Sequence, residues 1–223
     1  MLTAVATLSR RRLALTVHTP RELFVPLATT FAGLSVIVDR DSGAQRELLA
    51  APIPRPLLIL GNLLVVLGLC ALQIVVVIAA AALRGADFHV TASGVAWFAA
   101  SAVLFVVLMY GVAEALAARI PQQEEYIGAT PVIAILPWFF AGALFPIGAL
   151  PGALTAFAKV LPLTHAMALM RYGLTDPRGT GLHDIWGAGS TTTQAWFSLA
   201  VVAAFAAVLV AIAIRAFTRS SIR

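Results

Sequence analysis

Long stretches without Asp, Glu, Lys or Arg are the feature that most restricts how this sequence can fold. Leu57 to Leu83 supplies 27 such residues, Phe88 to Ala113 supplies 26, and Ala195 to Ile214 supplies 20. An α-helix needs about 20 mainly apolar residues to cross the hydrocarbon core of a bilayer. Each stretch is therefore long enough to span a membrane.

Two further apolar stretches are less regular. Leu23 to Val38 has only 16 residues and contains Pro26. Tyr126 to Ala158 is too long for one helix, and we expect it to be broken at its four prolines, Pro131, Pro137, Pro146 and Pro151. The fold class that follows is all-α: a polytopic membrane helical bundle of four to five spans.

Composition supports this class and excludes others. Hydrophobic residues make up 61% of the chain and charged residues 11%, whereas a soluble domain carries about 25% charged residues. A single cysteine, Cys70, excludes an intrachain disulfide and a cysteine-based metal cluster. The net charge of +5 comes from basic residues that flank apolar stretches. This distribution indicates membrane topology, and no nucleic-acid partner is expected.

The positions of the arginines predict the orientation. Cytoplasmic loops of membrane proteins carry an excess of Lys and Arg. We therefore place the C-terminus of this multi-pass protein on the cytoplasmic side of the cell membrane. The loops around Arg84–Ser93 and Leu174–Gln194 are then external. The basic residues kept inside are Arg40, Arg46, Arg55, Arg119, Arg215, Arg219 and Arg223.

The segment Leu154–Met170 is apolar apart from Lys159 and resembles another span. A full crossing here would send the C-terminal arginines outside, which is unfavourable. We therefore predict an external hairpin over residues 149–173, built as a re-entrant or interfacial pair of short helices. Lys159 and Arg171 are expected to extend their charges to the outer interface.

Residues 39–56 form the most highly charged segment between apolar stretches. Ser42 and Gln45 have the spacing of a helix-capping box. The sequence predicts a short amphipathic cytoplasmic helix, with Leu48 and Leu49 able to dock into a partner's groove. An ordinary charged loop is an equally good interpretation of the composition alone.

Two motifs together resemble the ABC-2-type permeases, which export drugs, lipids and polysaccharides. The first matches the family's cytoplasmic coupling helix at Asp39, Arg40, Asp41, Gly43, Glu47, Leu48, Leu49, Pro52 and Arg55. The second matches its fifth span and external hairpin at Phe140–Pro151, Leu161–His165 and Arg171. The resemblance covers roughly Thr30 to the C-terminus and is nearest to the daunorubicin-resistance-type branch of multidrug exporters.

The resemblance implies a set of partners and functional residues. It implies a separate ABC ATPase subunit that binds ATP and Mg, a second permease copy, and an amphipathic drug or lipid as substrate. This chain itself is expected to bind no cofactor. Coupling to the ATPase is assigned to Asp39, Arg40, Asp41, Gly43, Arg46, Glu47, Leu48 and Leu49. The external gate is assigned to Phe145, Pro146, Leu150, Pro151, Pro162, Thr164, His165 and Arg171.

The N-terminal region departs from the family pattern. Residues 1–22 resemble the cytoplasmic elbow helix that precedes one transmembrane domain, here residues 23–223. Family members usually have six spans, yet only Leu23–Val38 lies where two spans are expected. Three explanations stay open. This stretch dips into the membrane and returns to the same side, or the basic N-terminus is moved across the membrane, or the chain is a shortened variant. A membrane scaffold or assembly subunit that does not transport is the alternative function.

Motifs for catalysis are absent from the sequence. It has no Gly-x-x-x-x-Gly-Lys-Ser/Thr loop and no His-Glu-x-x-His, and its four histidines are widely separated. We expect no catalytic and no metal-binding residues. Candidates for the transport pathway are Glu114, Asn62 and Gln73, although interhelical hydrogen bonding suits Asn62 and Gln73 better. For Thr164 and His165, helix capping is the preferred interpretation.

Overall fold

The computed structural model describes residues 55–120, 122–142, 146–187 and 189–220, and within these ranges every regular element is helical. The predicted all-α fold is confirmed. The predictions for residues 1–54, including the elbow, the stretch Leu23–Val38 and the coupling residues, lie outside the described residues, as does Phe145. The elements are α5 (Arg55–Leu83), α6 (Ala92–Ala117), α7 (Gln123–Phe140), η1 (Ile147–Ala149), α8 (Gly152–Val160), α9 (Pro162–Leu174), α10 (Thr180–Trp186) and α11 (Thr191–Ser220).

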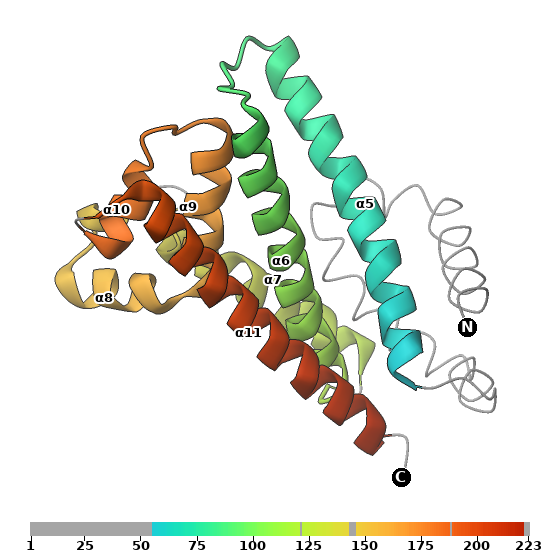
Figure 1. The fold of residues 1–223 in the computed structure, drawn as a ribbon. Helices are drawn as coiled ribbons and strands as arrows, with labels where there is room; N and C mark the ends of the chain where they lie inside the picture. The colour runs from blue at the N-terminus through green and yellow to red at the C-terminus, as the bar shows by residue number, and fades with distance from the viewer. Residues whose placement is uncertain (1–54, 121, 143–145, 188, 221–223) are drawn as a thin grey trace. The chain divides into compact units, whose positions relative to one another are not determined.

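Three described helices, α5, α6 and α11, are long and apolar enough to cross a membrane. Figure 1 shows each of them as one continuous helix. Only 22% of the most apolar window of α5 is buried within the protein, and the values for α6 and α11 are 33% and 22%. Apolar side chains that the rest of the protein leaves uncovered suit a lipid environment. Three of the predicted spans are therefore confirmed.

The stretch from Tyr126 to Ala158 breaks, but not at every proline. Pro131 and Pro137 lie inside α7, so the expectation that they interrupt the helix is wrong. Proline inside a membrane helix is tolerated because neighbouring groups can satisfy the carbonyl that loses its partner. The chain instead leaves the helix after Phe140, where Gly142 adopts a φ of 77°.

The predicted pair of short helices is confirmed. α8 and α9 meet at an angle of 79° around Leu161. Pro162 starts α9 at a position where a missing N–H costs nothing. Counted as one broken span, the pair would raise the number of candidate spans in the described part to four. Its place on the outer side of the membrane stays a prediction.

The chain forms two compact units. Within the first, the described residues are 55–78, 109–120, 122–130 and 208–220. Tyr110 is fully buried there, and its hydroxyl donates a hydrogen bond of 3.1 Å to the carbonyl of Ile59. Gly111 allows α6 to approach α11 closely, since a Cβ on this residue would lie 2.9 Å from the Cβ of Leu209.

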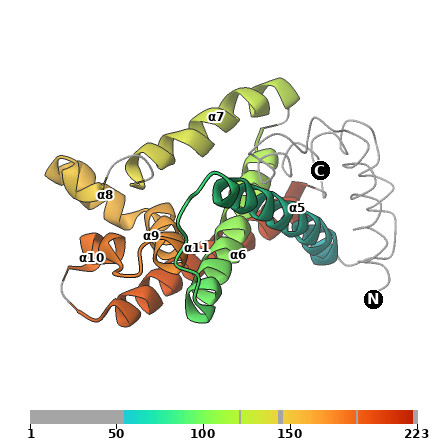
Figure 2. The same ribbon diagram turned by 90° about the horizontal axis from the view of Figure 1, so that it is seen from above.

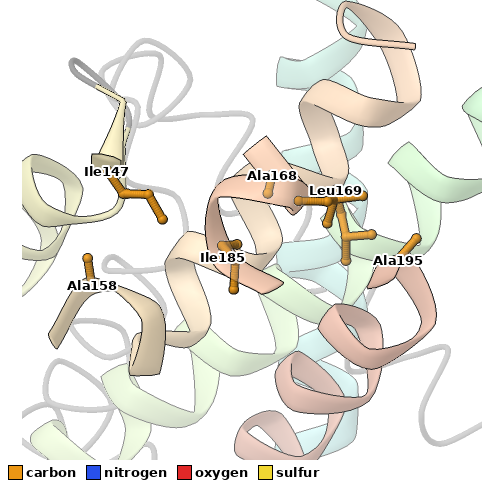
Figure 3. Packing of buried hydrophobic residues seen from close by; sticks show 7 residues of the cluster. Ile147, Ala158, Ala168, Leu169, Ile185 and Ala195 are labelled. Atoms are coloured by element: carbon orange, nitrogen blue, oxygen red, sulfur yellow. The ribbon is translucent and has the colours of Figure 1, made fainter. Parts of the chain in front are cut away.

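The second unit, residues 79–108 and 131–207, contains the short helices and their own apolar core. Figure 2 shows α10 beside α9, with α8 next to them. In Figure 3, small and branched side chains converge from η1, α8, α9, α10 and the first turns of α11. The buried members of this core are Ile147, Ala158, Ala168, Leu169, Leu182, Ile185 and Ala195.

Candidate functional site

The described gate residues gather in the second unit. We use the name hairpin site for α8, α9, α10 and the first two turns of α11, with η1 leading into them. Pro146 and Pro151 precede η1 and α8, and Pro162 opens α9. The site therefore has its bends where proline fixes the backbone. The gate residues placed around it are Pro146, Leu150, Pro151, Pro162, Thr164, His165 and Arg171.

Thr155 joins η1 to α8, a role that the sequence analysis did not detect. Its hydroxyl lies 2.9 Å from the carbonyl oxygen of Leu150, 3.1 Å from that of Ile147 and 3.3 Å from that of Pro151. A threonine hydroxyl carries one hydrogen, so it donates to one of these carbonyls at a time. The turn before α8 is therefore held by a side chain as well as by the prolines.

His165 is the buried centre of a chain of hydrogen bonds. It is 2% exposed, and its Nε2 lies 2.9 Å from the carbonyl oxygen of Lys159. Its Nδ1 lies 3.2 Å from Oγ of Ser198, which also lies 2.8 Å from Nε1 of Trp186. These bonds connect α8, α9, α10 and α11 through side chains.

The donors and acceptors of this chain fix the form of the imidazole. A carbonyl oxygen only accepts, so Nε2 of His165 carries a hydrogen. The indole of Trp186 only donates, so Ser198 Oγ accepts from it and can donate its own hydrogen to Nδ1. A neutral His165 satisfies all three bonds. In a protonated His165, Nδ1 would also carry a hydrogen, so Ser198 Oγ would face two donors, one from His165 and one from Trp186, and its own hydrogen would lose this acceptor.

The capping expectation holds for one of the two residues. Lys159 lies in the last turn of α8, where carbonyl groups lack helical partners, and His165 supplies one of them with a donor. Thr164 does not cap α9: Leu161 is the N-cap residue, and no side chain makes a capping hydrogen bond there. Thr164 is 2% exposed instead, because it lies on the buried face of α9.

Arg171 ties α9 to the end of α7. The guanidinium group donates a hydrogen bond from Nη2 to the carbonyl oxygen of Gly142. Arg171 is half-buried, and its predicted reach to the outer interface stays a prediction. Phe140 at the end of α7 packs edge-on against Phe157 of α8, with ring centroids 5.9 Å apart. Two contacts thus fix the start of the hairpin site to α7.

Two glycines bring α6 and α9 into backbone contact. A Cβ on Gly173 would lie 2.6 Å from the carbonyl oxygen of Gly94, which is closer than real atoms approach. The hydroxyl of Ser101 adds a buried bond of 3.0 Å to the carbonyl of Ala166. Trp97 packs nearby against Trp196, with centroids 5.0 Å apart. The hairpin site is therefore anchored to α6 as well as to α11.

The candidate pathway residues belong to the first unit. Glu114 is 4% exposed in the last turns of α6, and its role in transport stays a prediction. Asn62 and Gln73 are half-buried in α5. Their spacing is about three helical turns, which places both on the same face. Among the residues described, no group of three or more His, Cys, Asp or Glu side chains has the geometry to hold a metal ion.

The fold and the site define a multi-pass helical membrane protein with a bent pair of helices among its spans. A family model for ABC-2 type transporters matches residues 23–175, which is more than half of the 223 residues. The chain belongs to this family, and it is a membrane permease component of an ABC transporter. Membership implies an ABC ATPase as partner. No curated protein and no solved structure was found to match the chain.

Proposed function

We propose that the chain is the permease half of an efflux transporter that moves an amphipathic drug or lipid outward. The family match carries the proposal, because it runs from residue 23 through the charged segment 39–56 to the hairpin site. The apolar spans α5, α6 and α11 suit a substrate that enters from the membrane. ATP is hydrolysed by the partner subunit, and two copies of the permease form the pathway.

The charged segment is the contact with the ATPase. In this proposal Glu47 and the neighbouring Arg46 seat the segment in a groove of the partner, and Leu48 and Leu49 fill its apolar floor. Nucleotide-driven association of two ATPases moves the segment and tilts the spans. A ligand shifts such an equilibrium only through its different affinity for the two states, so the contacts of this segment decide the coupling.

The hairpin site is the external end of the pathway and moves as one piece. Its helices are linked by the bonds of His165, Ser198 and Trp186 and by the bond from Arg171 to Gly142. Because the hairpin site is rigid, it transmits the tilt of α6 and α11 to the external end of the pathway. Both the C-terminus and the segment 39–56 then lie on the cytoplasmic side.

Coupled ATP hydrolysis tests the function directly. The chain is co-purified with a candidate ABC ATPase partner and reconstituted in liposomes with a fluorescent phospholipid or a cationic dye as probe. We expect probe-stimulated ATP hydrolysis together with probe export. Glu47→Ala should abolish the stimulation, whereas Glu124→Ala, an exposed acid in the first turn of α7, should leave it unchanged.

Two results would redirect the proposal. Stable binding to the ATPase without any stimulation or export favours the scaffold function. Full stimulation and export by the Glu47→Ala variant would remove the coupling role from the segment 39–56 while leaving the permease function in place.

A further inference from the structure

The pairing of α9 with α6 sets how far the hairpin site reaches along a candidate span. Gly173 of α9 lies against Gly94 of α6, and the carbonyl of Ala166 accepts the hydrogen bond from Ser101. These two contacts are seven residues apart on each helix, and the numbering runs in opposite directions. Seven residues of helix rise by about 10 Å. α9 therefore lies antiparallel to α6, and its N-terminal end is the one farther from the start of α6.

The bend between α8 and α9 lies near the middle of α6. Leu161, at the bend, is five residues beyond Ala166, so it lies opposite about Val106, the fifteenth of the 26 residues of α6. α8 leaves the bend at 79° to α9 and so runs across the direction of α6. Because α6 is long and apolar enough to cross a membrane, the bend and α8 reach the depth of the hydrocarbon core.

The backbone at the bend has partners within the protein. The N–H of Leu161 donates to the carbonyl of Ala158, and the N–H of Thr164 donates to the carbonyl of Leu161. His165 donates to the carbonyl of Lys159. Irregular backbone at membrane depth is tolerated only where it is buried in protein or lines a water-filled cavity. These bonds suit the re-entrant form of the predicted hairpin.

One face of α8 is left open by the rest of the chain, and we call it the α8 face. Leu154, Phe157 and Val160 lie on it and are 38%, 53% and 66% exposed. Lys159 is half-buried at its edge, next to the exposed Ala156 three residues earlier. The α8 face therefore combines an apolar surface with one cation.

Lys159 has no partner among the described residues. Its ammonium group makes no hydrogen bond or ion pair with them, and it is not among the side-chain groups that the protein closes off. The sequence has no acidic residue between Glu125 and Asp176. A charged side chain at membrane depth is costly unless paired, and such residues mark the paths of ions and substrates. The missing partner is therefore a negative charge from outside this part of the chain.

We propose that the α8 face lines the export pathway and binds an amphiphile with a negatively charged head group. Lys159 pairs with the oxyanion of the head group, and the apolar residues of the face contact the apolar part of the molecule. The inference rests on the proposed export function and names the class of substrate. A head group at this depth belongs to a molecule in transit, because a resident lipid keeps its phosphate outside the hydrocarbon core.

Export of two matched probes tests the inference. The chain and a candidate ABC ATPase are reconstituted in liposomes with phosphatidylglycerol or phosphatidylcholine that carries the same fluorescent acyl chain. We expect export of the phosphatidylglycerol probe to be about tenfold faster, the effect of one hydrogen bond between charged groups. Lys159→Gln should remove this preference, and Lys159→Arg should keep it. Arg178→Gln, at an exposed residue before α10, is the matched control and should also keep it.

Binding to the chain without its ATPase separates this inference from the export function. The purified protein in detergent is titrated with short-chain phosphatidylglycerol and short-chain phosphatidylcholine, and calorimetry measures the affinities. We expect the anionic lipid to bind more tightly and Lys159→Gln to weaken its binding about tenfold. The thermal stability of this variant should not fall, because Lys159 has no partner in the described part of the chain.

The two tests fail in different ways. A wild-type chain that binds the anionic lipid through Lys159 but exports neither probe loses the proposed export function and keeps the binding site. Unchanged export and binding in Lys159→Gln overturn the inference and leave the export function in place. Equal affinity of the wild-type chain for both short-chain lipids, or no binding of either, also overturns the inference.

Discussion

α5 and α9 differ in what surrounds their side chains, and this difference separates the two kinds of helix in this protein. Large apolar side chains along α5 are left uncovered by the rest of the chain, among them Leu64 and Leu72, each 54% exposed. α9 instead encloses polar groups, since Thr164 and His165 are each 2% exposed. One helix is built to be surrounded by lipid and the other to be surrounded by protein.

The forces that hold the two regions differ accordingly. In the first unit, the contacts of α5 and α11 with α6 rest on the fit at Gly111 and on the hydrogen bond from Tyr110 to Ile59. In the hairpin site, side-chain bonds from Thr155, His165 and Arg171 link successive short helices. Lipid offers no hydrophobic driving force between helices, so close packing matters in the spans. Short helices with two bends need directed bonds in addition.

A charge placed on the uncovered face of α5 should have the largest effect, a loss of membrane insertion. Leu72→Asp places a carboxylate near the middle of a span, which costs about 3 kcal/mol during membrane insertion. We expect the yield of inserted protein to fall sharply in a membrane-insertion assay. Ala153→Asp, at an exposed site in α8, should insert normally. Equal losses in both variants would contradict the distinction between a lipid-facing span and the hairpin site.

A change that disturbs the tight packing of α6 against α9 should have the next largest effect, a loss of thermal stability. Gly173→Ala adds a Cβ that would lie 2.6 Å from the carbonyl of Gly94, so the two helices must separate. Overpacking of this kind costs about 2 kcal/mol, and thermal unfolding in detergent should show a lower midpoint. Gly181→Ala is the matched control, because its nearest neighbour would be 3.5 Å away. A control variant as unstable as Gly173→Ala would show that packing is not the cause.

Removal of one hydroxyl from each region should give unequal, smaller effects. Ser198→Ala leaves Trp186 and His165 without their shared partner and should cost about 2 kcal/mol. Tyr110→Phe removes one donor from a carbonyl that belongs to a helix, and should cost about 1 kcal/mol. The midpoints of thermal unfolding measure both. A larger loss for Tyr110→Phe would reverse the assignment of directed bonding to the hairpin site.

The spans were predictable because length and the absence of charge are local properties of the sequence. The bend between α8 and α9 was also predictable, since Pro162 and the long apolar stretch before it left few alternatives. The two prolines inside α7, Pro131 and Pro137, could not be predicted in this way, because the surroundings decide whether a proline ends a membrane helix.

The bonds of the hairpin site could not be predicted in the same way. His165 and Ser198 are 33 positions apart, and nothing in either local sequence identifies the other as its partner. Trp186 is 12 positions from Ser198, and its local sequence likewise gives no sign of the bond between them. A cavity that Ile147, Arg171 and Asp184 help to line likewise depends on how η1, α9 and α10 fold together.

The hydrogen-bond chain through His165 has one further consequence. An indole N–H can only donate and an amide carbonyl can only accept, so both ends of the chain, at Trp186 and at Lys159, have a fixed direction. Conduction of a proton along such a row requires every bond to reverse its polarity, which these two ends forbid. The histidine therefore links α8, α9 and α11 without offering protons a path along this chain of bonds.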